Sequence, residues 1–277
     1  MPLSFFQQHN VHTTMWIALI GALLVGLSLG LLGSGGSILT VPVLVYLVGE
    51  PDKVAIAESL GIVAAIAAAG ALPYARQRTI DWRSVLFFGI PGIAGTYGGA
   101  WLSRFVSGPV QLVLFAGVML LAAVLMYRRS TPRPTPTVSS AGGVAIRKHA
   151  AWKIMLEGVS VGVLTGLVGV GGGFLIVPAL VLLGGLDMRR AVGTSLVIIA
   201  LKSVAGYLKY LDVLADLGLA VNWEVVGLFA AVGIAGSFAG NWIGGRIPQH
   251  RLQRGFAVFL VVMGLWILYQ NLSVLTG

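Results

Sequence analysis

The sequence predicts an all-α polytopic membrane protein built from two inverted-topology repeats, each with about five hydrophobic segments. Three observations carry this prediction: an apolar composition, a glycine motif that occurs twice, and an uneven distribution of basic residues. The 277-residue chain is 57% hydrophobic and 10% charged, with a mean hydropathy of +0.93. A soluble domain of this size cannot bury so much apolar surface, and apolar runs of membrane-spanning length recur along the whole chain.

The glycine motif GLLGSGGSILTVPVL at 30–44 returns as GLVGVGGGFLIVPAL at 166–180, and the offset of 136 residues continues without a gap to Tyr74 and Tyr210. Four glycines within seven residues do not favour a straight helix, because each costs about 1 kcal/mol relative to alanine. In membranes such glycines either allow close helix packing or break the helix. Breaks at matched places in two halves favour glycine-broken hairpins that meet near the midplane.

The hydrophobic segments are expected in the same order in both halves. They lie at about 14–32, 37–48, 53–72, 85–105 and 110–127, and again at about 154–170, 173–183, 190–211, 225–245 and 256–272. Asp52 is expected to cap the third segment, and Pro73 to begin the loop after it. The second segment, roughly 18 Å long, is either part of a bent crossing or a re-entrant hairpin. The glycines shared by GIAGTYGGAWL at 92–102 and GIAGSFAGNWI at 233–243 suit tight helix packing.

Residues 128–150 differ in kind, because Pro, Ser, Thr and Arg dominate them and no apolar periodicity is present. We expect this stretch to be a flexible cytoplasmic linker. It would join a first membrane repeat at 1–127 to a second at 151–277.

The basic residues predict the orientation of the chain. An odd number of crossings in each half requires the two halves to insert in opposite directions. With the linker in the cytoplasm, 14 of the 18 Lys and Arg residues lie on that side: Arg76, Arg78, Arg83, Arg128, Arg129, Arg133, Arg147, Lys148, Lys153, Arg189, Arg190, Arg246, Arg251 and Arg254. Only Lys53, Arg104 and Lys209 would lie outside. This bias predicts that both termini are outside, and it argues against nucleic acid as the partner of a chain with net charge +9.

The two glycine breaks are candidate anion sites. Each precedes a short helix whose free N–H groups and positive dipole end would point toward the membrane centre. The candidate residues that would approach a small anion are Gly33, Ser34, Gly35, Gly36 and Ser37 in the first copy and Gly169, Gly171, Gly172 and Gly173 in the second. The alternative is that these glycines only allow the chain to reverse.

Lys202 is the most informative single residue, since it lies roughly 18 Å into a hydrophobic segment. An ionisable group at that depth is functional by default. It would hold the negative charge of a substrate, or pair with an acid, for which Glu58 is the best candidate. Glu58 would otherwise lie at the membrane interface.

Hydroxyl and amide side chains near these positions are further candidates. Ser59, Thr194 and Ser195 would face the site or bond their own helices. Asn241, expected to be a buried amide where the first half has Ala100, is a pathway candidate.

Catalytic and metal-binding patterns are absent from the sequence. Cys is missing, and His9, His12, His149 and His250 form neither a metal-binding spacing nor a nucleophile–base pair. We therefore expect no enzyme activity, no cofactor and no metal.

The two glycine motifs, together with Gly193, Thr194 and Ser195, resemble the paired signatures of the sulfite exporter TauE/SafE family of bacterial membrane transporters. The resemblance covers about 15–269 and excludes the linker. It implies a multi-pass protein of the bacterial inner membrane that moves small sulfur-containing anions, such as sulfite, sulfonates or sulfoacetate. The signature residues carried over are Gly33, Gly35, Gly36, Pro42, Gly169, Gly171, Gly172, Pro178, Thr194 and Ser195. Asn is expected to be common in the family where this chain has Lys202.

Composition and resemblance together predict a secondary transporter, with export as the leading interpretation, that works by alternating access. Protons are a candidate coupling ion, and the sequence leaves the coupling ion and the direction of transport open. The alternatives are a passive anion channel and a transporter of a carboxylate or another oxyanion.

Overall fold

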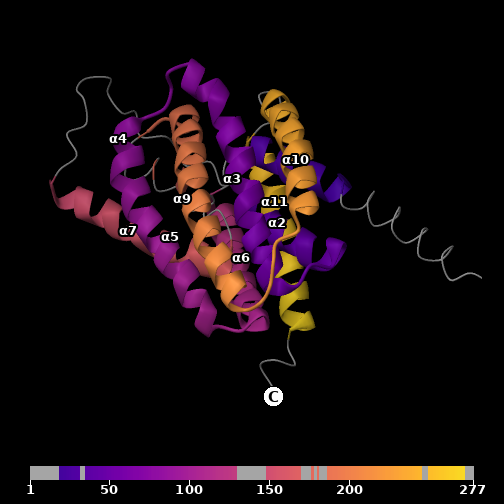
Figure 1. Cartoon of the computed structure of the whole chain (residues 1–277). Coiled ribbons are helices and arrows are strands. Elements are labelled where there is room, and N and C mark those ends of the chain that lie inside the picture. The colour runs from indigo at the N-terminus through magenta and orange to yellow at the C-terminus, as the bar shows by residue number, and fades with distance from the viewer. Residues whose placement is uncertain are drawn as a thin grey trace, which may run out of the picture.

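The computed structural model describes residues 19–31, 35–129, 148–169, 176–177, 180, 186–244 and 249–271. Every regular element within these ranges is a helix (Figure 1). Four stretches are long and apolar enough to cross a membrane: Asp52–Arg76, Trp82–Phe105, Arg189–Asp216 and Trp223–Ile243. Shorter apolar helices cover Leu19–Leu31, Ser37–Val48, Gly108–Val124, Met155–Val168 and Ala257–Gln270. The all-α prediction is therefore confirmed.

The centre of the molecule is a pair of long helices that correspond to each other in the repeat, α3 (Asp52–Arg76) and α9 (Met188–Asp216). Gly61 near the start of α3 faces the ring of Tyr207 near the end of α9. Gly193 near the start of α9 faces Tyr74 near the end of α3. The two helices therefore run antiparallel, and α3 is buried along most of its length.

Two further helix pairs pack through glycine. α5 (Ile90–Leu102) lies against α7 (Lys148–Val168), and the helix Leu19–Leu31 lies against α10 (Trp223–Gly244). A Cβ at Gly162 would overlap the carbonyl of Gly92, and a Cβ at Gly26 would overlap the carbonyl of Gly233. Gly26 and Gly162 occupy matched places in the repeat, as do Gly92 and Gly233. The first helix of each half is thus packed against the fourth helix of the other half, at backbone-to-backbone distances that only glycine permits.

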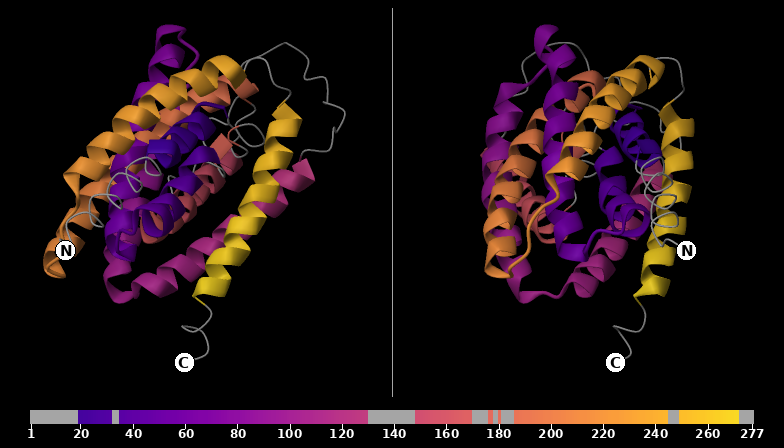
Figure 2. Two further views of the ribbon diagram at one scale, coloured as in Figure 1. Left: turned by 90° about the vertical axis from the view of Figure 1, so that its right-hand side faces the viewer. Right: turned by 45° about the vertical axis from the view of Figure 1, so that its right-hand side comes forward.

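α6 (Gly108–Arg129) and α11 (Gln249–Gln270) pack against each other at the edge of the molecule (Figure 2). α11 also contacts the short helical stretch before Gly49, where the Trp266 and Tyr46 rings meet edge to face at 4.3 Å. The Asn271 side chain donates a hydrogen bond of 3.2 Å to the Tyr46 hydroxyl.

The remaining elements are short turns of helix that begin or end the longer ones. They are η1 (Gly35–Leu39), α2 (Thr40–Pro42) and η2 (Val43–Val48) before α3, α4 (Trp82–Ser84) and η3 (Val85–Gly89) before α5, and η4 (Ser103–Phe105) after it. η1 and η4 are 3₁₀ helices, and η2 and η3 are π-helical.

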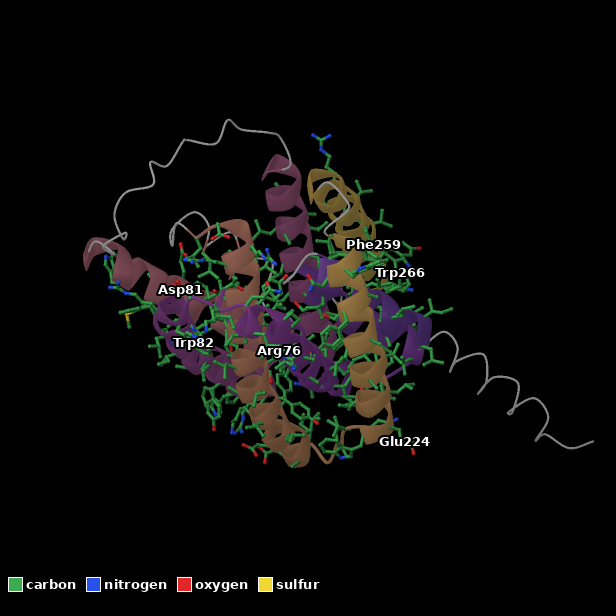
Figure 3. All side chains as sticks on the ribbon, turned by 90° about the horizontal axis from the view of Figure 1, so that it is seen from above. Arg76, Asp81, Trp82, Glu224, Phe259 and Trp266 are labelled. Atoms are coloured by element: carbon green, nitrogen blue, oxygen red, sulfur yellow. The ribbon has the colours of Figure 1, made fainter. Side chains whose placement is uncertain are left out.

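Large apolar side chains cover the outside of the bundle, including Trp82, Trp223 and Trp242. In Figure 3, Phe259 and Trp266 of α11 lie on the opposite side of the molecule from Trp82 of α4, and side chains project outward between them. A surface of this kind suits lipid rather than water.

Several expected boundaries are wrong in an informative way. α3 continues through Pro73 to Arg76, because a proline in the last turn removes only one intrahelical hydrogen bond. Asp52 does not occupy the capping position of α3: Pro51 is the N-cap residue and makes no side-chain capping bond, and Asp52 is the first helical residue. α6 and α7 reach Arg129 and Lys148, inside the range expected for the linker; residues 130–147 lie outside the described residues.

Candidate functional site

The two glycine breaks are only partly within the described residues. The candidates that lie outside them are Gly33, Ser34, Gly171, Gly172 and Gly173. Of the short segment expected at 173–183, only residues 176–177 and 180 are described. Gly35 and Gly36 begin the 3₁₀ helix η1, and Ser37 within it is fully buried. Gly169, with φ of 76°, ends α7 in the left-handed conformation that glycine adopts without strain. The structure therefore places a helix start after the first break and a helix end at the second.

Lys202 is fully buried on α9, and its ammonium nitrogen has no hydrogen-bond partner among the described residues. Its stem lies over Gly92: a Cβ at that glycine would be 3.0 Å from the lysine Cδ. The Nζ atom lies 5.9 Å from the centre of the Phe88 ring. A cation–π contact is the only attraction the described part of the chain supplies for this charge.

The matched position in the first half shows what this place requires structurally. Ile66 of α3 corresponds to Lys202, and its side chain fills the space over Gly233, the counterpart of Gly92. An aliphatic side chain therefore satisfies the packing on one side. Packing against the facing glycine therefore does not require the ammonium group of Lys202.

Glu58 does not pair with Lys202 by hydrogen bond or ion pair among the described residues. It is fully buried, and its Oε1 accepts a 2.7 Å hydrogen bond from the backbone N–H of Asn222, just before α10. Its Oε2 is buried without a partner. The two ionisable side chains therefore remain separate, and each has a buried polar atom without a partner among the described residues.

The hydroxyl candidates are all buried, and they do different things. Thr194 accepts a 2.9 Å bond from the backbone N–H of Asp81. Ser195 donates only to Val192 O within its own helix, at 2.8 Å. Ser59 donates at 2.7 Å to Gly169 O, at the second glycine break, as well as to its own helix. Of the three, Ser59 alone is bonded to a glycine break.

Sequence reasoning gave no role to Tyr210 and Gln111, which hold the chain just before the second break. Gln111 Nε2 donates to Leu167 O at 2.6 Å and to the Tyr210 hydroxyl at 2.9 Å, and Tyr210 donates to the same carbonyl at 3.1 Å. Both side chains are fully buried. The signal available in the sequence was the repetition of this tyrosine as Tyr74.

A small pocket lies at the opposite end of the α3–α9 pair, beside the first break. Its empty space of about 230 Å³ includes open solvent, and the part closed in by side chains admits about one water-sized molecule. Leu29 and Gly30, Tyr74, Leu196, Ser237 and Asn241 contribute to its lining from four helices. Asn241 is exposed here rather than buried, which corrects the expectation from sequence, because the pocket opens beside it.

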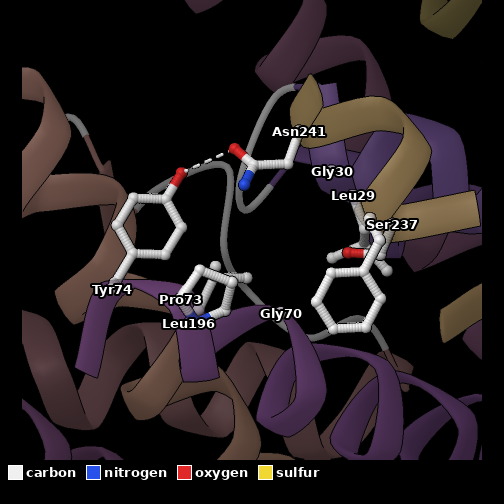
Figure 4. A pocket seen from close by; sticks show the side chains of 9 residues that line it. Leu29, Gly30, Gly70, Pro73, Tyr74, Leu196, Ser237 and Asn241 are labelled. Atoms are coloured by element: carbon white, nitrogen blue, oxygen red, sulfur yellow. Dashed lines mark hydrogen bonds between the residues drawn. The ribbon is translucent and has the colours of Figure 1, made fainter. Parts of the chain in front are cut away.

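The polar groups of this pocket are neutral. The Tyr74 hydroxyl donates a 3.2 Å hydrogen bond to Asn241 Oδ1, and Figure 4 shows the amide nitrogen directed toward the space between the two sides of the pocket. Ser237, whose matched residue is Thr96, adds a hydroxyl from α10. These donors can hydrogen-bond a small polar solute. Lys202 does not line this pocket; its side chain lies against Gly92 and Phe88. Among the described residues no three His, Asp or Glu side chains gather as metal ligands would.

Comparison with known proteins gives a consistent result. A family model described as "Sulfite exporter TauE/SafE" matches residues 18–267. A "Probable membrane transporter protein" of Xylella fastidiosa is 31% identical over 255 residues, covering 90% of this chain and 92% of its own length. The "Probable membrane transporter protein YunE" of Bacillus subtilis is 27% identical and covers 92% of this chain and 98% of its own. No solved structure matches the chain.

These matches confirm the resemblance carried by the two glycine motifs. They also confirm the expectation of a multi-pass membrane transporter rather than an enzyme.

Proposed function

Since the chain belongs to the sulfite exporter TauE/SafE family, we propose that it is a secondary transporter that exports small sulfur-containing anions, sulfite or organosulfonates such as sulfoacetate. It works by alternating access across the bacterial inner membrane. The glycine breaks bring backbone N–H groups to the anion, and Lys202 supplies the positive charge.

The burial of Lys202 carries this proposal. An ammonium group removed from water is costly unless an opposite charge or hydrogen-bond acceptors compensate it. The described protein offers Lys202 a ring face and no acceptor. A bound anion would compensate the charge, and it would leave the aliphatic packing over Gly92 unchanged.

Alternating access is supported by the way the two halves meet. The corresponding helices α3 and α9 run antiparallel, and the glycine contacts between halves occur in matched pairs. This arrangement suits inverted repeats that rock against each other about a central site. One end of the α3–α9 pair carries the pocket, while the other is tied by Tyr210 and Gln111.

The decisive test compares wild-type protein with Lys202→Ile, which places at 202 the residue type of the matched position 66. Purified protein is screened by thermal shift against sulfite, sulfate, thiosulfate, taurine, sulfoacetate and carboxylate analogues. We expect sulfur anions to raise the melting temperature of the wild type and to bind the variant at least tenfold more weakly. The variant without ligand should melt no earlier than the wild type, since no acid loses a partner.

Two other results would redirect the proposal. Unchanged affinity in Lys202→Ile would remove Lys202 from the site. A shift with carboxylates alone would favour the alternative substrate class. Counterflow in liposomes separates a carrier from a channel, since only a carrier exchanges labelled for unlabelled anion against a gradient.

The orientation is also a proposal, with both termini outside and residues 128–150 in the cytoplasm. It rests on the excess of Lys and Arg in the loops of one side. The chain has no Cys, so a single cysteine at Ser139 reports its own side. An impermeant thiol reagent should leave it unlabelled in spheroplasts and label it in inverted vesicles; the reverse pattern would overturn the orientation.

A further inference from the structure

Glu58 and Thr194 occupy the same place in the two halves and make the same contact. The N–H of Asn222 donates to Glu58, and the N–H of Asp81 donates to Thr194. Asn222 and Asp81 correspond in turn, and each uses its own side chain to accept backbone N–H groups of the helix that follows. The structural role of position 58 is therefore to bind Asn222, the residue that caps α10.

Thr194 performs this task with one hydroxyl, so a carboxylate at position 58 exceeds what the fold requires. The surplus atom is Oε2, which is buried and has no hydrogen-bond partner within the described ranges of the chain. The hydroxyl of Tyr207 is likewise buried without a partner among those residues. Tyr207 lies on α9 against Gly61, one turn along α3 from Glu58. An ionised carboxylate is poorly accommodated here, whereas a carboxyl group that holds a proton on Oε2 carries no charge into the bundle.

We propose that Glu58 is the proton-binding site that couples the transporter to a proton gradient. The carboxylate takes up one proton from the outer side, where α3 begins in the proposed orientation, and it releases the proton when the bundle opens inward. No other bond is made or broken. This inference rests on the proposed transport function and adds the coupling ion to it.

The groups around Glu58 favour a proton over a metal cation. The nearest acid is Glu50, in the loop before α3, whose Oε1 lies 3.4 Å from Asn222 Nδ2. Tyr207 faces Glu58 from α9, and Glu224 of α10 is exposed. Lys209 of α9 is bonded to Asp212 instead. Hard cations need about six oxygen ligands, and no cluster of three acidic or His side chains exists in the described part of the chain.

The test uses the full-length protein in liposomes, with labelled sulfite or sulfoacetate and a pH-sensitive dye inside. Wild type should accumulate anion when the liposome interior is made more acidic than the outside, and protons should leave the lumen as the anion enters. Glu58→Gln, which keeps an acceptor for Asn222, should lose gradient-driven accumulation at least tenfold. Counterflow of anion without a gradient should continue within about twofold. Glu58→Thr, which copies Thr194, is a second variant in case the first fails to fold.

The outcomes separate this inference from the proposed function. Absence of counterflow in wild type for every anion tested would contradict the transport proposal itself. Normal counterflow with unchanged gradient-driven accumulation in both variants would overturn only the role of Glu58. Accumulation in wild type driven by a sodium gradient and not by a pH gradient would overturn the proton as the coupling ion. Loss of counterflow in correctly folded variants would instead assign Glu58 to substrate binding.

Discussion

The two ends of the α3–α9 pair are built from matched residues and differ in how they are closed. At one end Tyr210 is fully buried and, with Gln111, holds the carbonyl of Leu167 just before a glycine break. At the other end the matching Tyr74 is only partly buried and bonds Asn241 at the mouth of a pocket. The same tyrosine therefore holds the chain before one break and lines an open pocket at the other end of the pair, because its partners come from parts of the two halves that have diverged.

This difference indicates that the repeated sequence determines where the helices cross, whereas a few side chains that differ between the halves determine which end of the α3–α9 pair has a pocket. Ala100 stands where the second half has Asn241, and fully buried Thr96 stands where it has Ser237. One end is filled and the other retains space. An alternating-access transporter needs such an imbalance, since both ends must not open together.

The largest effect is expected at the glycine contacts that both ends share. A Cβ at Gly166 would overlap the carbonyl of Thr96, and a Cβ at Gly30 would overlap the carbonyl of Ser237. Gly166→Leu and Gly30→Leu should each cost about 3 kcal/mol or more, because the backbones must separate. Yield of monodisperse detergent-solubilised protein measures this. The control is Gly227→Leu on α10, where a Cβ meets nothing within 4 Å, and its yield should stay near that of the wild type. Equal losses of yield in all three variants would show that the close glycine contacts are not specially required.

A smaller effect should separate the two tyrosines. Tyr210→Phe removes a buried hydroxyl that accepts from Gln111 and donates to Leu167 O, so it should cost about 1–3 kcal/mol. Tyr74→Phe removes one bond at an exposed pocket mouth and should change stability by less than about 0.5 kcal/mol. Thermal unfolding of the two purified variants makes the comparison. Similar melting temperatures would mean that the two ends are equally closed in solution.

A third prediction concerns access rather than stability. Single cysteines at Ser237 and at its counterpart Thr96 should differ in reactivity toward a small water-soluble thiol reagent. Ser237, although only 4% exposed, lines the pocket, whereas Thr96 is fully buried and donates to Gly92 O at 2.8 Å. We expect at least tenfold faster labelling at 237, equivalent to about 1.4 kcal/mol. Labelling at equal rates would show that the chain spends comparable time open at both ends.

The sequence by itself determined the class of protein and showed that its motifs occur twice. Hydropathy identified the membrane segments because the lipid interior accepts apolar helices and excludes most other segments. The 136-residue offset between the two glycine motifs identified the two halves. The position of Lys202 within a hydrophobic segment could be counted along the chain, and the structure adds that its side chain is fully buried in the bundle. These properties depend on local composition and spacing, which do not require knowledge of partners.

Tertiary structure alone decided which groups meet. Glu58 was a reasonable partner for Lys202 on charge, yet it contacts Asn222, 164 residues away along the chain. Asn241 was expected to be buried, and the pocket formed by four helices leaves it exposed. Gln111 gave no signal at all, since its partners are a backbone carbonyl, which every residue possesses, and the hydroxyl of Tyr210, which is 99 residues away along the chain. Contacts of this kind depend on helix rotation and register, and one sequence leaves both undetermined until the helices are packed.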